Sequence, residues 1–189
     1  MRNQLKQEIE SIHPLDSIEG DTINGVLAWI DSGVELCRIE KPATPNKHLV
    51  SYFVVIDGDY LLLVDHINAE KWLPTGGHVE SGEHPRKTVI REAYEELKIQ
   101  AEFIQENPVF LTSTETVGKT SGHTDVCLWY VIKGNRNVPL EIDTTEFYES
   151  RWFNRNLLPA NSDPNLSRFV NKLFNTSRRK IKIRKITDE

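Results

Sequence analysis

The chain has 189 residues and a mass of 21.8 kDa, with 38% hydrophobic and 27% charged residues. This composition excludes a fibrous or disordered protein and predicts one globular unit that buries a sizeable core. No run approaches the roughly 18 consecutive apolar residues of a membrane span, and the charged N-terminus is unlike a secretory signal, so we expect a cytoplasmic protein that does not bind membranes. The two cysteines, Cys37 and Cys127, have no CxxC spacing and indicate neither a disulfide framework nor a structural zinc site.

The charge is unevenly distributed. The net charge is −5, but residues 177–189 carry six basic and two acidic residues, which leaves −9 on residues 1–176. An acidic body argues against broad nucleic-acid binding, because phosphate contacts need Lys and Arg. A protein with such an acidic body would need metal ions to bind phosphate groups. The basic tail is either a solvated terminus or a contact for a polyanion or a partner subunit.

The first 45 residues have a helical pattern. Leu5, Ile9 and Ile12 recur at helical spacing, and Asp21 is expected to cap a second helix that ends at Gly33. We expect a helical extension that dimerises, covers a pocket or completes the core.

A β-rich body follows. Residues 49–56 and 60–64 are predicted strands joined by a turn at Asp57-Gly58-Asp59, and a Gly-rich loop at 74–82 leads into a helix over 84–97. Further predicted elements are strands at 101–105, 109–116, 126–132 and 148–153 and a helix at 164–174 capped by Asp163. Strands before and after a central helix predict an α/β fold with a mixed sheet and helices on both faces.

Three carboxylates on the central helix carry the chemistry. At about 100° per residue, Glu95 and Glu96 lie on either side of Glu92, so we expect the three to share one exposed face. Clustered oxygen ligands suit Mg²⁺ or Mn²⁺, and the preceding glycine-rich loop allows close approach of backbone to an ion and a phosphate.

The segment from Gly77 to Ile99 closely resembles the Nudix box of the Nudix hydrolase superfamily. The matching residues are Gly77, Glu83 and the Arg-Glu-Ala-Tyr-Glu-Glu run at 91–96. One position departs from the box, because Lys98 stands where a glycine usually ends the helix in a left-handed turn. That substitution is expected to cost about 1 kcal/mol if the turn is kept.

The resemblance implies a Nudix-type α/β/α sandwich. Its expected boundaries are 46–176, preceded by the helical extension at 1–45 and followed by the basic tail at 177–189. Residues 143–153 resemble a late segment of the family from which Glu146 would supply another metal ligand or the general base.

The resemblance also implies a reaction, the divalent-metal-dependent hydrolysis of a nucleoside diphosphate linked to a group X. Metal would be held by Glu92, Glu95, Glu96 and the carbonyl of Gly76, while Arg91 would pair with Glu83. The general base stays open between Glu96, Glu83 and Glu146. The favoured substrate is a (d)NTP such as an oxidised purine dNTP.

Alternatives remain at this point. ADP-ribose or a nucleotide sugar is a second substrate class, because a dimer-swapped architecture would explain the N-terminal extension, and a homodimer is left open. A non-catalytic module that senses a nucleotide is the third reading. His78 and Asp125 are candidate substrate contacts, against the alternative that each serves a local turn.

Overall fold

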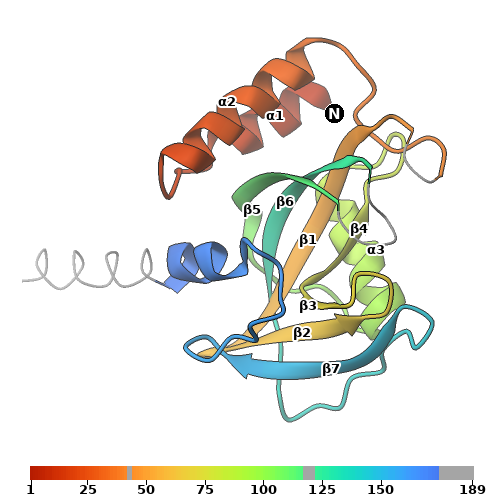
Figure 1. Ribbon diagram of the computed structural model, residues 1–189, viewed down its shortest axis with the longest axis vertical. Coiled ribbons are helices and arrows are strands. Elements are labelled where there is room, and N and C mark those ends of the chain that lie inside the picture. The colour runs from red at the N-terminus through yellow and green to blue at the C-terminus, as the bar shows by residue number, and fades with distance from the viewer. Residues whose placement is uncertain (42–43, 117–121, 175–189) are drawn as a thin grey trace, which may run out of the picture.

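The computed structural model describes residues 1–41, 44–116 and 122–174, so the basic tail predicted at 177–189 lies outside the described residues. The helices are α1 (Arg2–Glu10), α2 (Ser17–Asp31) and α3 (Pro85–Leu97). The strands are β1 (Lys47–Asp57), β2 (Tyr60–His66), β3 (Lys71–Leu73), β4 (Thr75–His78), β5 (Phe103–Glu115), β6 (Thr124–Lys133) and β7 (Phe147–Asn154). Residues 166–174 form a further helix, drawn in blue in Figure 1.

The strands form one mixed sheet in which β1 is central (Figure 1). The strand order is β3-β2-β1-β6-β5; β4 pairs with β1, and β7 pairs with β2. β1 runs parallel to β6, with His48 opposite Asp125, and antiparallel to β4, with Val50 opposite His78. This register brings the beginnings of β1 and β6 and the end of β4 to one end of the sheet.

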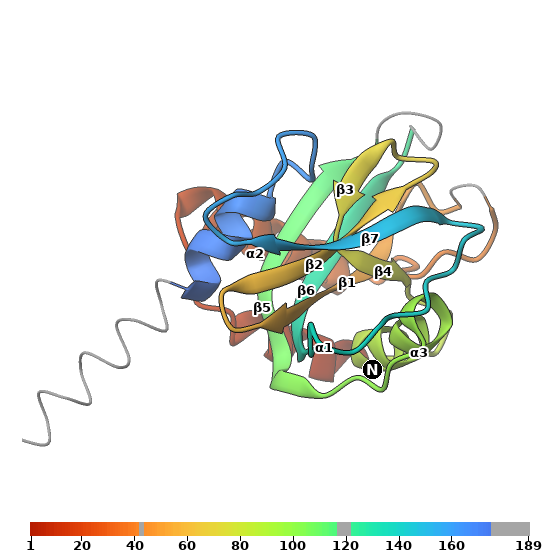
Figure 2. The ribbon, with the colours of Figure 1, turned by 90° about the horizontal axis from the view of Figure 1, so that it is seen from below.

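Two apolar clusters cover the two faces of the sheet. Phe53 belongs to the cluster that includes residues of α1, α2 and α3, whereas its neighbour Val54 belongs to the cluster that includes residues 166–170. Successive side chains of a strand point to opposite faces, so α1, α2 and α3 cover one face and the last helix covers the other (Figure 2). The predicted α/β/α arrangement with a mixed sheet is confirmed.

The N-terminal helices pack on the same core as the body. Leu5 and Ile9 of α1 are fully buried. Glu19 of α2 is buried as well, and its carboxylate contacts β5 and the last helix. Its Oε1 lies 2.5 Å from the Lys172 ammonium and accepts a hydrogen bond from the Leu111 amide, and its Oε2 accepts one from the Leu15 amide. Of the roles left open for this extension, completing the core is the one these contacts support.

The cap of α2 differs from the prediction. Asp16, not Asp21, is the N-cap, and its side chain accepts a hydrogen bond from the Glu19 amide. Asp16 has the extended backbone that a cap requires, whereas Asp21 lies inside the helix.

Three other boundaries were also wrong. The predicted loop at 74–82 contains β4, and the two strands predicted at 101–105 and 109–116 are the single strand β5, whose pairing with β6 shifts register twice. The last helix begins at residue 166 rather than 164. Within the described ranges, no helix combines the length and apolar character needed to cross a bilayer.

Candidate active site

Helix α3 has well-defined ends. His84 is its N-cap and accepts a hydrogen bond from the Arg86 amide, and Pro85 occupies the first turn, where its missing N–H is not needed. At the C-terminus Lys98 adopts the left-handed conformation (φ 53°, ψ 31°) that a glycine would adopt without strain. The turn that the Nudix box requires is therefore kept despite the lysine.

The two glycines of β4 allow the close approach of two neighbours, α3 at Gly77 and β1 at Gly76. A β-carbon at Gly77 would lie 1.8 Å from Glu92 Oε1, so the carboxylate occupies the space that a side chain would fill. The Gly76 amide donates a 3.1 Å hydrogen bond to Glu96 Oε2. Gly76 also has φ 152°, and a β-carbon there would meet the carbonyl oxygen of Ser51 at 2.2 Å. Gly77 is thus required by the contact of β4 with α3, and Gly76 by the contact of β4 with β1.

The expected contact between Arg91 and Glu83 is present. Arg91 Nε and Nη2 donate to the two oxygens of Glu83, both at 3.1 Å, and Nη2 also reaches the carbonyl oxygen of His78 at 3.2 Å. The same guanidinium contacts Glu92 at 2.6 Å and Glu95 at 3.2 Å. Arg91 therefore joins the loop before α3, the helix itself and the end of β4.

The three glutamates do not share one exposed face, which corrects the sequence-based expectation. Glu95 is exposed, with 56% of its side chain accessible, whereas Glu92 is largely covered and Glu96 is buried. The reason is helical geometry. Glu96 follows Ala93 by three residues and precedes Leu97, so it lies at the edge of the apolar stripe that packs on the sheet.

Burial destabilises the charged forms of the two inner carboxylates. Burial, reinforced by the nearby charges of Glu92 and Glu146, raises the pKa of Glu96 well above its ordinary value. Burial also raises the pKa of Glu92, and Arg91 offsets this effect in part. Burial would raise the pKa of Glu83 as well, but hydrogen bonds from Arg91, the Glu80 amide and Thr88 leave it lowered.

These carboxylates suit a divalent cation. A cation of the Mg²⁺ class prefers oxygen ligands and would offset the burial and the neighbouring carboxylate charges that raise the pKa of Glu92 and of Glu96. Glu146 is exposed and near enough to act electrostatically on both glutamates. Glu92 and Glu96, with Glu146 nearby, therefore fit the divalent metal that the sequence predicts, whereas the exposed Glu95 lies outside this covered pair.

The side chains of the two predicted substrate contacts, His78 and Asp125, lie together on the face of the sheet opposite the glutamates. His48 and Asp125 are opposite each other in the register, as are Val50 and His78. His48 therefore shares a face with Val50, in the cluster that α3 does not touch. Both residues belong to a group with His48 and His123, whose ligand atoms lie within 4.8 Å of one another.

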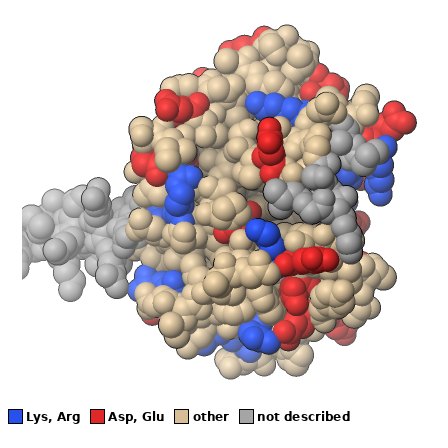
Figure 3. All heavy atoms as spheres, in the orientation of Figure 1, with Lys and Arg blue, Asp and Glu red and all other residues tan. Residues whose placement is uncertain are grey.

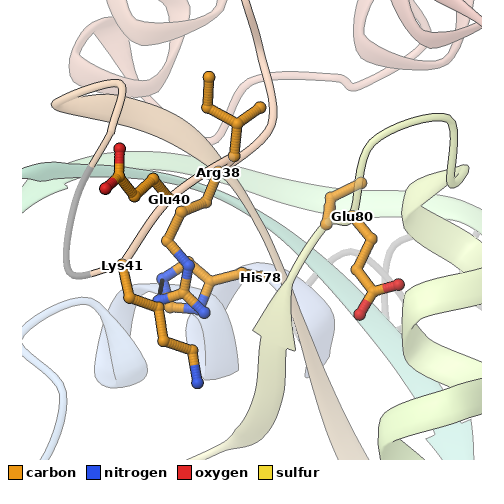
Figure 4. A pocket seen from close by; sticks show the side chains of 7 residues that line it. Arg38, Glu40, Lys41, His78 and Glu80 are labelled. Atoms are coloured by element: carbon orange, nitrogen blue, oxygen red, sulfur yellow. Dashed lines mark hydrogen bonds between the residues drawn. The ribbon is translucent and has the colours of Figure 1, made fainter.

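A cavity of about 210 Å³ adjoins His78. It is lined by the segment 38–41 and by residues 78–80, so the N-terminal connector forms one of its walls. Arg38 Nη1 lies 3.3 Å from His78 Nε2, and Lys41 comes from the same connector, while Glu40 and Glu80 point away from the imidazole ring (Figure 4). Burial, with the neighbouring charge of Arg38, lowers the pKa of His78 to about 4.

Sequence reasoning missed Arg38, Lys41 and His48. The connector carried no periodic or motif signal, and His48 was placed beside Asp125 only by the pairing of β1 with β6. On the face drawn in Figure 3, basic side chains are dispersed among acidic ones rather than gathered in one broad patch.

Comparisons with known proteins agree with this geometry. A family model described as the NUDIX domain matches residues 46–173. No match was found among curated proteins. A NUDIX-family hydrolase from Clostridium perfringens is 22% identical, with 68% of this chain and 97% of that chain covered and a TM-score of 0.55. A MutT NUDIX hydrolase from Burkholderia pseudomallei is 19% identical, with 66% and 95% covered and a TM-score of 0.54.

Proposed function

Because this chain belongs to the Nudix family of hydrolases, we propose that it hydrolyses a nucleoside diphosphate linked to a group X, with a divalent metal as cofactor. The observation that carries the proposal is the pair Glu92 and Glu96. Both carboxylates are held against the Gly76-Gly77 strand, and both have a raised pKa. A module that only binds nucleotide has no need for two covered and mutually repelling carboxylates.

The proposed metal ligands are Glu92, Glu95, Glu96 and the carbonyl of Gly76, with Mg²⁺ or Mn²⁺ as the ion. When bound, the metal would neutralise charge on the phosphates, polarise a phosphoryl oxygen and activate water. The protein's own contribution is to hold these oxygens on a helix whose position Arg91 fixes relative to the loop and β4.

Glu83 is better suited to positioning than to proton transfer. Both of its oxygens accept hydrogen bonds, from Arg91, Thr88 and the Glu80 amide, and its pKa is lowered. A general base needs a lone pair that can reach the attacking water. These contacts support Glu96 or Glu146 as the general base, with Arg91 and Glu83 as positioning residues.

Arg38 and Lys41 are proposed to contact the phosphates of the substrate, since they supply positive charge in the cavity beside His78. A nucleoside triphosphate, such as an oxidised purine dNTP, is the substrate class we would test first. The N-terminal helices pack on the chain's own core, so the dimer-swapped arrangement that favoured ADP-ribose gains no support. We propose residues 46–176 as the catalytic unit and residues 1–45 as its extension.

A phosphate-release screen tests this proposal. The panel would contain nucleoside triphosphates, oxidised dNTPs, ADP-ribose, nucleotide sugars and dinucleoside polyphosphates, each with and without inorganic pyrophosphatase, in Mg²⁺ and in Mn²⁺. We expect metal-dependent turnover that Glu96→Gln lowers at least about 100-fold, equivalent to about 2.7 kcal/mol of transition-state stabilisation.

The matched control is Glu102→Gln, which removes an exposed glutamate paired with Lys133 and should leave turnover unchanged. Turnover of ADP-ribose alone would move the proposal to the second substrate class. No turnover across the panel, together with nucleotide-dependent thermal stabilisation, would replace it with the sensing module.

A further inference from the structure

Three histidines and an aspartate gather at the end of the sheet, on the face opposite α3. They come from the start of β1, the end of β4, the residue just before β6 and the start of β6, and their ligand atoms all lie within 4.8 Å of one another. We propose that His48, His78, His123 and Asp125 form a second metal site, which binds Zn²⁺ and is separate from the glutamates of α3.

The spacing of the ligand atoms fits a tetrahedral ion. Asp125 Oδ1 lies 3.3 Å from His48 Nε2 and 3.3 Å from His123 Nε2. Zinc-ligand bonds of about 2.0–2.1 Å in a tetrahedron place neighbouring ligand atoms about 3.3 Å apart. Two edges of such a tetrahedron are therefore already formed without movement.

The outer partners of the histidines also fit. His48 Nδ1 lies 2.8 Å from the carbonyl oxygen of Pro45, and His123 Nδ1 lies 3.2 Å from the Thr116 hydroxyl. A zinc-bound histidine usually donates its other ring N–H to an oxygen, which fixes the tautomer and directs the lone pair at the metal. In both residues the nitrogen left for the ion is the Nε2 that faces Asp125.

Unsatisfied polar atoms point to a missing ligand. His48 is fully buried, and His48 Nε2 and Asp125 Oδ1, although 3.3 Å apart, make no hydrogen bond among the described residues. A buried polar atom without a partner is unfavourable, so such atoms are rare without an unseen water or ion. One cation at the centre of the cluster would satisfy both atoms.

His78 is the ligand that must change its partner. Its Nε2 lies 3.3 Å from the Arg38 guanidinium, which comes from the connector beside the cavity. An ion bound to this nitrogen would displace the guanidinium of Arg38, which lines the adjoining cavity together with His78 (Figure 4).

The ligand chemistry separates this site from the carboxylates of α3. Imidazole nitrogen suits zinc and other transition metals, whereas Mg²⁺ prefers oxygen. Four protein ligands form a closed site of the structural kind. The ion would join three strands and so hold the end of β4, which carries Gly76 and Gly77. The sequence expectation of no structural zinc site considered cysteine spacing alone.

Metal binding to the full-length protein tests the inference. Protein stripped with a chelator would be dialysed against Zn²⁺ in excess Mg²⁺, which occupies the oxygen sites, and the retained metal would be measured by mass spectrometry. We expect about one zinc per chain. We also expect Co²⁺ to give the strong visible absorption of a tetrahedral site, and Zn²⁺ at about 100 Kd to raise Tm by roughly 5–10 °C.

Variants assign the site. His48→Gln and His123→Gln should each weaken zinc binding at least about 10-fold. His123→Gln serves if loss of the fully buried His48 prevents folding, which circular dichroism would report. His13→Gln, which alters an exposed histidine outside the cluster, should bind zinc as the wild type does.

Glu96→Gln keeps this inference distinguishable from the proposed function, since it should abolish hydrolysis but retain the zinc. Zinc below half an equivalent in the wild type, or unchanged affinity in both folded histidine variants, would overturn the inference.

Discussion

The carboxylate of Glu92 occupies the space into which a β-carbon at Gly77 would project. Gly77→Ala should therefore displace the carboxylate while leaving the backbone in place. We expect kcat to fall at least about 10-fold and Tm to change by less than about 4 °C. Gly25→Ala is the control, because this position in α2 has open space and alanine favours the helix. A Gly77→Ala enzyme with wild-type kcat would show that the position of Glu92 is not critical.

Arg91 should not be replaceable by lysine. The fork of Arg91 contacts both oxygens of Glu83 and the carbonyl of His78, which a single ammonium cannot reproduce. Arg91→Lys is expected to lower stability by about 1–3 kcal/mol and to lower kcat as well, measured by urea unfolding and steady-state kinetics. Arg86→Lys, at an exposed pair with Glu106, should change neither quantity. Equal effects of the two substitutions would contradict the positioning role.

Arg38 is expected to contribute to substrate binding. Arg38→Gln removes a positive charge from the cavity wall and should raise KM about 10-fold with little change in kcat. The double variant with Lys41→Gln should raise KM further, and steady-state kinetics at two salt concentrations would measure both effects. A fall in kcat at unchanged KM would instead place Arg38 in the chemical step.

Lys98→Gly should stabilise the protein. A non-glycine residue in the left-handed conformation costs about 1 kcal/mol, so glycine is expected to raise Tm by about 2–4 °C. Part of that gain is offset, because Lys98 Nζ donates to the Glu95 carbonyl at 3.0 Å. Lys98→Ala separates the two effects, since it removes the ammonium and keeps the β-carbon. Calorimetry that ranks alanine above glycine would refute the strain argument.

The buried pair of Glu19 and Lys172 should be sensitive to loss of one partner. Glu19→Ala leaves a covered ammonium and two backbone amides without their acceptor, so we expect a loss of about 3–5 kcal/mol in unfolding free energy. Lys6→Ala at the surface pair with Asp31 should cost less than about 1 kcal/mol. Comparable losses in urea unfolding would mean that burial does not distinguish the two pairs.

Much of the fold could be predicted because it is encoded locally. The hairpin at Gly58 follows from a turn residue between two apolar runs, and Pro85 marks the first turn of α3. The Nudix box adds a fixed spacing, so the pairing of Glu83 with Arg91 could also be predicted from the sequence.

What could not be predicted depends on contacts between distant segments. Glu96 is buried because α3 packs closely on β4, where Gly77 has no side chain to hold them apart. Helical periodicity alone does not show which strand a helix packs against. His48 meets His123 and Asp125 through a parallel pairing of strands that lie far apart in the sequence. Parallel pairs have no turn to set their register, so only the structure shows which residues meet.

The ion pair between Glu19 and Lys172 can form only late in the synthesis of the chain. The two residues are 153 positions apart, and Glu19 leaves the ribosome long before its partner is made. Until then the nascent N-terminal helices carry a carboxylate whose burial has no compensating charge. Completion of the fold therefore waits until Lys172 has been made, when the last helix docks against the first part of the chain.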